Sequence, residues 1–196
     1  AMSIGGNHLI HILRRNMDIK ILMFNNRIYG LTKGQYSPTS ELGKKTKSTP
    51  HGSLDHPFNP LSLALGSGAT FAARTLNREI KHLGEIVKRC NEHKGTSFVD
   101  IYQNCNIYND GAFFDLTDKE TKAETQLVLE HGQPMVYGAG QSKGLRLNGS
   151  QLESVTLGKD FSIDDILVHD ESNKSLAFYL SEITLDPKLP TPIGVL

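Results

Sequence analysis

Residues 19–24, IKILMF, followed at once by the pair Asn25-Asn26, decide the fold. A short, nearly continuous apolar run of this kind is typical of a strand that is buried on both faces in a parallel sheet. A second run, TSFVDIY at residues 96–102, is also followed by polar residues, and residues 69–73 have the pattern of a third strand. These runs predict the strands of one sheet, with polar side chains at the ends of two of them.

Three helical patterns accompany the predicted strands. Residues 7–16 carry an apolar stripe and two late arginines, which suit the negative end of a helix dipole. Residues 61–65 form a short apolar helix that Gly66 ends. A longer helix, capped by Asn77, has apolar side chains three and four residues apart, at Ile80, Leu83, Val87 and Cys90. Strands that alternate with such helices predict an α/β fold whose mostly parallel sheet is flanked by helices, with Cys90 in its core.

Composition excludes several classes of protein. The 196 residues are 38% hydrophobic, which is enough for a packed core. Lys and Arg number 21 and so do Asp and Glu, so no net charge attracts nucleic acid. No run approaches the ~18 apolar residues of a membrane-spanning helix. The two cysteines lie in different surroundings and do not suggest a disulfide framework, which predicts a cytoplasmic protein.

The chain changes character near residue 111. Residues 1–111 hold the α/β pattern, interrupted at residues 27–59 by a loop that is far longer than those usual in compact domains. Residues 112–196 read as an extension that packs on this body or on a partner subunit. Within the extension we expect a partly helical stretch, short β-like pieces, a late helix and an extended tail, at residues 116–130, 135–157, 176–183 and 187–192.

A candidate site follows the first strand, because ligands of open parallel sheets gather at the carboxyl ends of the strands. Residues 24–35, FNNRIYGLTKGQ, offer an amide, turn carbonyls, a hydroxyl and an ammonium group within a few residues. Oxygen ligands suit Mg²⁺, while backbone donors, Thr32 and Lys33 suit a phosphate and another nearby anion. The bland alternative is an ordinary turn, in which Asn is a common residue.

These residues also resemble a known family. The Asn25-Asn26 pair is similar to the close of the thiamine-diphosphate motif, and most of the chain resembles the β subunit of 2-oxoacid:ferredoxin oxidoreductases, especially the 2-oxoglutarate enzymes. The resemblance lies in SIGGNHLIHILRRN (3–16), FNNRIYGLTKGQYSPTS (24–40), STPHGSLDHPFNPL (48–61), HKGTSFVDIYQNCNIYNDGAF (93–113), LVHDE (167–171) and PIGVL (192–196). It implies the thiamine-diphosphate-binding fold. It also implies that the Gly-Asp-Gly half of the motif precedes Ala1, so the sequence is expected to be the carboxyl-terminal part of a longer subunit.

The resemblance assigns the cofactor contacts residue by residue. Asn26 would give its side-chain oxygen, and Ile28 its backbone carbonyl, to Mg²⁺. Gly30 and Leu31 would line the diphosphate of thiamine diphosphate with their backbones, with Thr32 beside it. A third protein ligand to Mg²⁺, an aspartate, would come from the preceding stretch.

Two further residues receive roles from the resemblance. Lys33 would pair with the carboxylate of the 2-oxoacid; related pyruvate enzymes often have glycine there, so the lysine favours 2-oxoglutarate or a broader substrate range. Cys105 resembles the last of four cysteines that hold a 4Fe-4S cluster, the other three also preceding Ala1. No residue of this chain is expected to act as a general acid or base.

The resemblance thus implies a subunit of an oxidoreductase that decarboxylates a 2-oxoacid and transfers the acyl group to coenzyme A. Electrons would pass through the iron–sulfur cluster to ferredoxin, and an α subunit would complete the active site. The fragment alone is expected to be inactive. The alternative from another class is a non-catalytic scaffold or assembly module that retains the thiamine-diphosphate fold.

A serine hydrolase is a further alternative. Residues 140–144, GQSKG, match the Gly-x-Ser-x-Gly elbow, and Asp165 and His169 follow in the chain order of a triad. Ser142, however, lies between β-like pieces and not at a strand-to-helix turn, which disfavours this reading.

Two small clusters have bland interpretations. His8 and His11 could bind a metal, but no carboxylate or thiol accompanies them, which favours helix packing. Lys44, Lys45 and Lys47 could meet the phosphates of coenzyme A or an acidic ferredoxin, although a solvated loop is the preferred interpretation.

Overall fold

A computed structural model describes residues 2–196, and the chain divides into a first unit that ends at Phe114 and a second unit, Asp115–Leu196. In the first unit, β1 (Lys20–Asn25), β5 (Ser97–Tyr102) and β4 (Phe71–Leu76) form a parallel sheet in that order. The expected α/β fold with a mostly parallel sheet is therefore confirmed. All six residues of β4 and all six of β5 are buried, so these two strands form the core.

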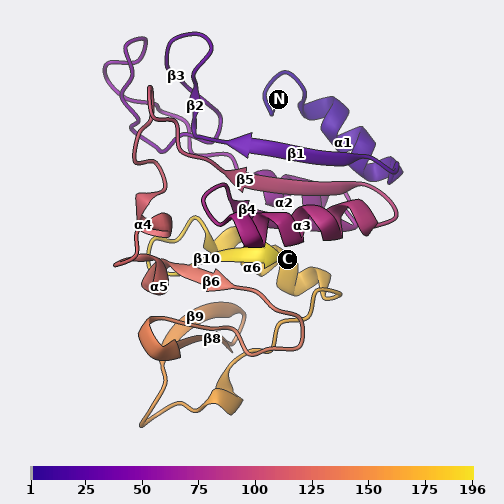
Figure 1. Ribbon diagram of the computed structural model, residues 1–196, viewed down its shortest axis with the longest axis vertical. Coiled ribbons are helices and arrows are strands. Elements are labelled where there is room, and N and C mark those ends of the chain that lie inside the picture. Colours follow the sequence, from indigo (N-terminus) through magenta and orange to yellow (C-terminus); the bar gives the residue numbers. More distant parts are fainter. Residues whose placement is uncertain (1) are drawn as a thin grey trace. The chain divides into compact units, whose positions relative to one another are not determined.

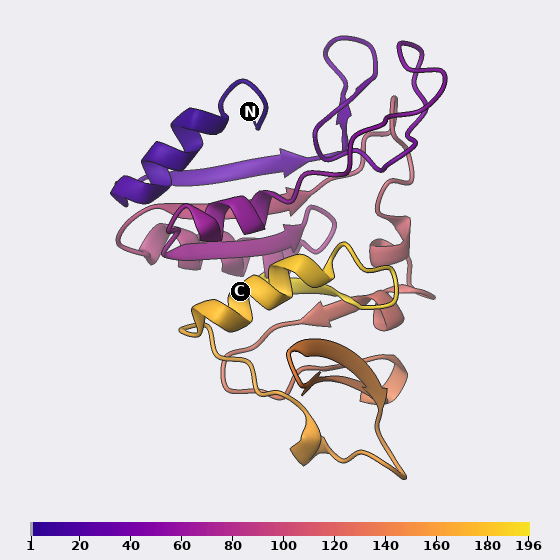
Figure 2. The ribbon, with the colours of Figure 1, turned by 180° about the vertical axis from the view of Figure 1, so that it is seen from behind.

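Helices cover both faces of this sheet. α2 (Pro60–Gly66) and α3 (Ile80–Glu92) lie on opposite faces, as Figures 1 and 2 show from the two sides, and α1 (Gly6–Arg15) packs beside α2. The carboxyl ends of the three strands all point toward the long loop, which begins with the hairpin of β2 (Ile28–Tyr29) and β3 (Gln35–Tyr36). Because the strands are parallel, the loops that follow all three of them lie at one edge of the sheet.

The end of α1 is tied to the start of two strands by Asn16. This residue has φ 47° and ψ 44°, the left-handed conformation that commonly ends a helix. Its side-chain oxygen accepts hydrogen bonds from the backbone N–H of Thr96 at 2.9 Å and from the hydroxyl of Thr70 at 2.8 Å. Helix, loop and sheet are therefore locked together at the edge opposite the candidate site.

The second unit contains a pair of parallel strands, a small antiparallel sheet and several helices. Its parallel pair is β6 (Gln126–Val128) with β10 (Thr191–Val195), and its antiparallel sheet has the order β7 (Val136–Tyr137), β8 (Lys143–Asn148), β9 (Gln151–Thr156). The helical segments are α4 (Phe114–Thr117), α5 (Lys122–Thr125), η1 (Ala139–Gln141), η2 (Ile163–Asp165) and α6 (Lys174–Ile183). The late helix is confirmed, and the tail that was expected to be merely extended ends in a strand.

Three details of the first unit differ from expectation. Leu22 and Phe24 on β1 are 39% and 61% exposed, so this strand is not buried on both faces, because it lies at the end of the strand order. Ile80 is 77% exposed: α3 begins at this residue, and its buried side chains come later, at Ile86 and Cys90. Asn77 does not cap α3; its backbone N–H donates to the carbonyl of Tyr102. Cys90 is buried, as predicted.

Within residues 2–196, no helix combines the length and the apolar character that crossing a membrane requires.

Candidate functional site

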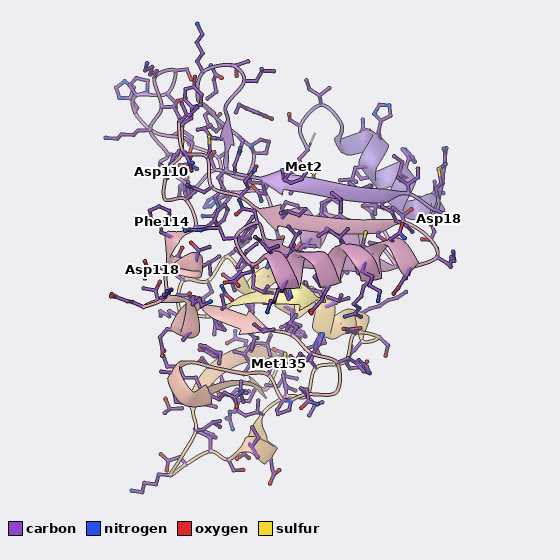
Figure 3. The ribbon with its side chains drawn as sticks, viewed as in Figure 1. Met2, Asp18, Asp110, Phe114, Asp118 and Met135 are labelled. Carbon is purple, nitrogen blue, oxygen red and sulfur yellow. The ribbon has the colours of Figure 1, made fainter. Side chains whose placement is uncertain are left out.

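The loops that follow β1 and β5 leave the sheet side by side. Asn25 pairs with Tyr102 in the parallel register, and the N–H of Gln103 donates to the carbonyl of Asn25 at 3.0 Å. Figure 3 shows Met2 and Asp110 toward this edge and Asp18 at the opposite one. The segment that begins at Asn26 and the segment that carries Cys105 therefore start from a common rim, as the sequence predicts.

The two adjacent asparagines have different surroundings. Asn25 is buried, donates to Asp100 Oδ1 at 3.1 Å and accepts from the hydroxyl of Thr39 at 2.7 Å. Asn26 is half-buried, and its side-chain oxygen accepts the N–H of Ile28 at 3.3 Å. Asn25 thus holds the loop to the core, while Asn26 keeps its amide at the surface of the site.

Beneath Asn25, two opposite charges lie within the sheet. Arg74 on β4 and Asp100 on β5 are register partners, are 1% and 0% exposed, and approach to 3.7 Å between Nε and Oδ2. Burial raises the pKa of Asp100, while the Arg74 guanidinium and the Asn25 amide oppose that shift. A buried charge needs such partners, so Asn25 serves both the loop and the core.

The hairpin turn of residues 30–34 has an unusual backbone. The N–H of Lys33 donates to Gly30 and the N–H of Gly34 donates to Tyr29, both at 3.0 Å. Lys33 has φ 72°, and Gly34 has φ 96°. A Cβ atom at Gly34 would lie 2.9 Å from the ring of Tyr108, so a side chain is excluded there. The turn consequently packs against the loop that follows β5.

A cavity of about 390 Å³ opens over this turn, within the range of small-molecule sites. It is lined by the five predicted contacts of Mg²⁺ and thiamine diphosphate, Asn26, Ile28, Gly30, Leu31 and Thr32. An amide oxygen, backbone carbonyls and a hydroxyl form a donor set that fits a hard cation and its diphosphate. Lys33 is exposed, and neither it nor Cys105 contributes to the lining of the cavity.

Cys105 lies against the same hairpin. It is half-buried, and its carbonyl accepts the N–H of Asn109 at 3.0 Å in a tight turn. A Cβ atom at Gly30 would lie 4.0 Å from the Cys105 sulfur. Among residues 2–196 no group of three or more His, Cys, Asp or Glu side chains could hold a metal, so a four-cysteine cluster would need ligands from elsewhere.

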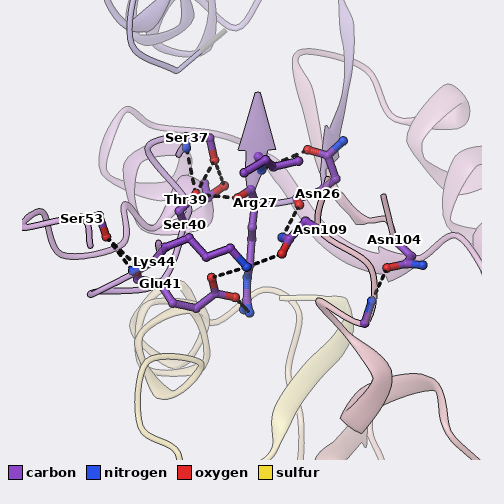
Figure 4. Close-up of polar contacts among 12 residues, drawn as sticks. Asn26, Arg27, Ser37, Thr39, Ser40, Glu41, Lys44, Ser53, Asn104 and Asn109 are labelled. Atoms are coloured by element: carbon purple, nitrogen blue, oxygen red, sulfur yellow. Dashed lines mark hydrogen bonds and ion pairs between the residues drawn. The ribbon is translucent and has the colours of Figure 1, made fainter. Parts of the chain in front are cut away.

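A polar network connects the long loop to both segments. Glu41 accepts from Arg27 at 3.0 Å and lies 4.0 Å from the Lys44 ammonium, which also donates to the side-chain oxygen of Asn109. The amide nitrogen of Asn109 in turn donates to the carbonyl of Asn26 at 3.0 Å (Figure 4). The network therefore joins residues that are far apart in the sequence around the Asn26 backbone.

This network corrects the interpretation of the basic cluster. Lys45 and Lys47 are exposed, as a solvated loop requires, but Lys44 is half-buried and paired. Sequence reasoning also missed Glu41 and Asn109, because their partners are distant in the chain and no local pattern marks them. The run of polar residues after β5 was the feature of the sequence that could have pointed to Asn109.

The structure does not assemble the other candidate sites. Ser142 lies between η1 and β8, the carboxylate of Asp165 accepts from Ser162, and the Nε2 of His169 faces the carbonyl of Val195 at 2.9 Å. The three side chains therefore do not form a triad. His8 and His11 are both exposed on α1, so the expected packing role for them is wrong.

Comparisons with known proteins show which family the first part of the chain belongs to. Residues 1–101 match the family described as "Thiamine pyrophosphate enzyme, C-terminal TPP binding domain". The chain is 53% identical, over its whole length, to 2-oxoglutarate oxidoreductase subunit KorB of Mycobacterium tuberculosis, of which it covers 52%. Over 109 residues, 56% of the chain, it is 47% identical to the 2-oxoacid:ferredoxin oxidoreductase subunit beta of Saccharolobus solfataricus, covering 36% of that protein.

A solved structure has the same fold. The 2-oxoglutarate:ferredoxin oxidoreductase from Magnetococcus marinus, with 2-oxoglutarate, coenzyme A and succinyl-CoA bound, aligns with a TM-score of 0.69 and 27% identity. The alignment covers all of this chain and 52% of that one, so the chain spans about half the length of these full-length matches. The expected resemblance to the β subunits of 2-oxoacid:ferredoxin oxidoreductases is confirmed. Through its first 101 residues, the chain belongs to the thiamine pyrophosphate enzymes.

Proposed function

We propose that the chain forms the cofactor-binding part of a β subunit in a 2-oxoacid:ferredoxin oxidoreductase, with 2-oxoglutarate as the preferred substrate. The whole enzyme would couple loss of carbon dioxide to formation of an acyl-CoA and to reduction of ferredoxin, together with an α subunit in the cytoplasm. The similarity to the M. tuberculosis and M. marinus proteins supports this assignment.

One observation carries the proposal. The five candidate contacts of Mg²⁺ and thiamine diphosphate line one cavity, and the sulfur of Cys105 lies against the turn that forms part of this lining. An electron acceptor is useful only where it lies close to the group that is oxidised. A fold without function would not require an oxygen donor set and a half-buried thiol on the same rim.

Each residue has a role that its chemistry fits. The side-chain oxygen of Asn26 and the carbonyl of Ile28 would hold Mg²⁺, and Thr32 and the backbone of Gly30 and Leu31 would meet the diphosphate. When bound, thiamine diphosphate supplies the electron sink for the pair that remains when carbon dioxide leaves.

Two residues would act outside the cavity that the cofactor contacts line. The exposed Lys33 ammonium, on the outer side of the turn, would pair with a substrate carboxylate. The Cys105 thiolate would bind one iron of a 4Fe-4S cluster, since thiolate is the usual ligand of these clusters.

Calorimetry of the complete subunit, assembled with its α partner, tests the proposal. Thiamine diphosphate is expected to bind only when Mg²⁺ is present, and Asn26→Ala should abolish this dependence together with most of the affinity. Asn148→Ala removes the same amide from the exposed end of β8 and serves as the control. Equal binding by the Asn26 variant and the wild type would overturn the assignment. No binding by the wild type would favour the scaffold.

A further inference from the structure

Asn109 is the residue where the two halves of the proposed site meet. The residue is 5% exposed, and it follows Cys105 by four residues. Its amide nitrogen donates to the Asn26 carbonyl at 3.0 Å, while its backbone N–H donates to the Cys105 carbonyl at 3.0 Å. One residue thus contacts the backbone of the proposed metal loop and that of the proposed cluster cysteine.

The other end of the same amide is also held. The Lys44 ammonium donates to the side-chain oxygen of Asn109, and Glu41 lies 4.0 Å from that ammonium. A cation on the oxygen of an amide withdraws electrons from it and strengthens the donation from its nitrogen. The Lys44 contact therefore reinforces the hydrogen bond from Asn109 to Asn26.

A hydrogen bond to the Asn26 carbonyl affects the orientation of the Asn26 side chain. The side-chain oxygen of Asn26 is held by the N–H of Ile28, two residues further on, so the direction of the amide depends on the local backbone. Fixing the carbonyl consequently fixes the oxygen that faces the cavity. Loss of the bond would remove the side-chain link that joins the Asn26 backbone directly to the turn that holds Cys105.

We propose that Asn109 is a positioning residue that holds the Asn26 loop and the Cys105 turn in one arrangement. This inference rests on the proposed function and deepens it. The consequence is a shared sensitivity: a change at Asn109 alters both the Mg²⁺ requirement for thiamine diphosphate binding and the spectrum of the cluster, although Asn109 contacts neither group.

Asn109→Asp is the informative change. It keeps the size of the side chain and an oxygen for Lys44, but it places an oxygen where the donor to Asn26 was. Asn106→Asp is the matched control, because Asn106 is exposed in the same loop and the change keeps the side-chain oxygen that accepts from the Asn104 amide at 2.6 Å. Both variants belong in the complete complex with its α subunit.

Two readouts are measured for each variant. We expect Asn109→Asp to raise the Mg²⁺ concentration for half-maximal thiamine diphosphate binding at least tenfold and to shift the electron paramagnetic resonance spectrum of the reduced cluster. Asn106→Asp should leave both as in the wild type. A lower melting temperature with unchanged Mg²⁺ dependence and an unchanged spectrum would show a merely structural role and overturn the inference.

A second variant covers the case in which Asn109→Asp does not fold. Lys44→Gln removes the cation but keeps a donor, and it should raise the Mg²⁺ requirement by a smaller factor of two or more; an unchanged requirement would overturn the inference. A wild-type complex without Mg²⁺-dependent binding or a cluster signal would instead overturn the proposed function, and the inference with it.

Discussion

At the scale of single residues, the two adjacent asparagines Asn25 and Asn26 have different roles, one in the core and one at the cavity. Asn25 faces the buried Asp100 and Thr39, and Asn26 faces the cavity. Substitution of Asn25 would leave a buried carboxylate with one partner fewer, which is costly for folding. Loss of cofactor binding in an Asn25 variant would therefore be ambiguous, whereas the Asn26 variant reports on the site.

Replacing Lys33 with glycine should raise the stability of the subunit and weaken its binding of the substrate. Its φ of 72° is unfavourable for any residue with a Cβ atom. Lys33→Gly should therefore stabilise the subunit by about 1 kcal/mol in denaturant unfolding. Loss of a hydrogen bond to a charged group should at the same time raise KM for 2-oxoglutarate by about ten- to a hundredfold.

Lys33→Ala separates the two effects, because it removes the ammonium but keeps the strained backbone. It should raise KM as much as glycine does, without the gain in stability. An unaltered KM in both variants would refute the pairing of Lys33 with the substrate carboxylate.

Cys105 and Cys90 form a natural pair for comparison. Cys105→Ala should abolish ferredoxin reduction but spare the release of carbon dioxide in a single turnover, since the cluster is needed only after that step. Cys90 is buried at the inner face of α3, so Cys90→Ala should lower stability and leave electron transfer intact. Electron transfer that persists in the Cys105 variant would exclude the cluster role.

At the scale of elements, the sequence patterns located the three strands of the parallel sheet and the helices of the first unit because burial there is strongly periodic or continuous, whereas the short strands β2 and β3 fell in the expected loop. The run at β5 is buried at every residue, which is why its pattern could be read directly. The exposure of Leu22 and Phe24 could not be predicted, since strand order is not encoded in any local run. The site residues that are contiguous in the sequence could be predicted. Asn109 could not be predicted, because its partner Asn26 lies 83 residues away in the chain.

Asn16 connects the end of α1 to the sheet, and two variants at this position should lower the free energy of unfolding by different amounts. Asn16→Gly loses the two hydrogen bonds from Thr96 and Thr70 but keeps the left-handed backbone, and should cost about 1–3 kcal/mol of stability. Asn16→Ala should cost about 1 kcal/mol more, because alanine disfavours that backbone. Denaturant unfolding of the complete subunit measures both. Equal losses would mean that the backbone conformation at Asn16 does not limit stability.

His169 makes the second unit sensitive to acid. Burial lowers its pKa below the ordinary value of 6.5, with His131 acting in the same direction and the carbonyl of Val195, Glu171 and Asp170 opposing it. Protonation is therefore easier in the unfolded chain, so this contribution to stability is complete above pH 6.5 and is lost as the pH falls toward the folded pKa.

The His169→Gln variant checks this assignment by thermal unfolding between pH 7.5 and about 5. The wild type should lose more stability across that window than the variant, which cannot titrate at this position. Parallel pH profiles of the two proteins would assign the acid sensitivity to other groups.

At the scale of the molecule, the chain brings the proposed metal loop and the Cys105 thiol to one rim by means of parallel strands that are neighbours in the sheet. The parallel register of β1 with β5 places the starts of both segments side by side. The long loop then fixes the arrangement through Glu41, Lys44 and Asn109. The spatial relation between metal and cluster thus follows from sheet topology, and is the central claim of the proposed function.

Pulsed electron paramagnetic resonance on the complete complex tests that relation most directly. With Mn²⁺ in place of Mg²⁺, thiamine diphosphate bound and the cluster reduced, the two paramagnetic centres should show a dipolar coupling that Asn26→Ala removes. A Mn²⁺ signal and a cluster signal that are both present but uncoupled would contradict a common site at the rim of β1 and β5.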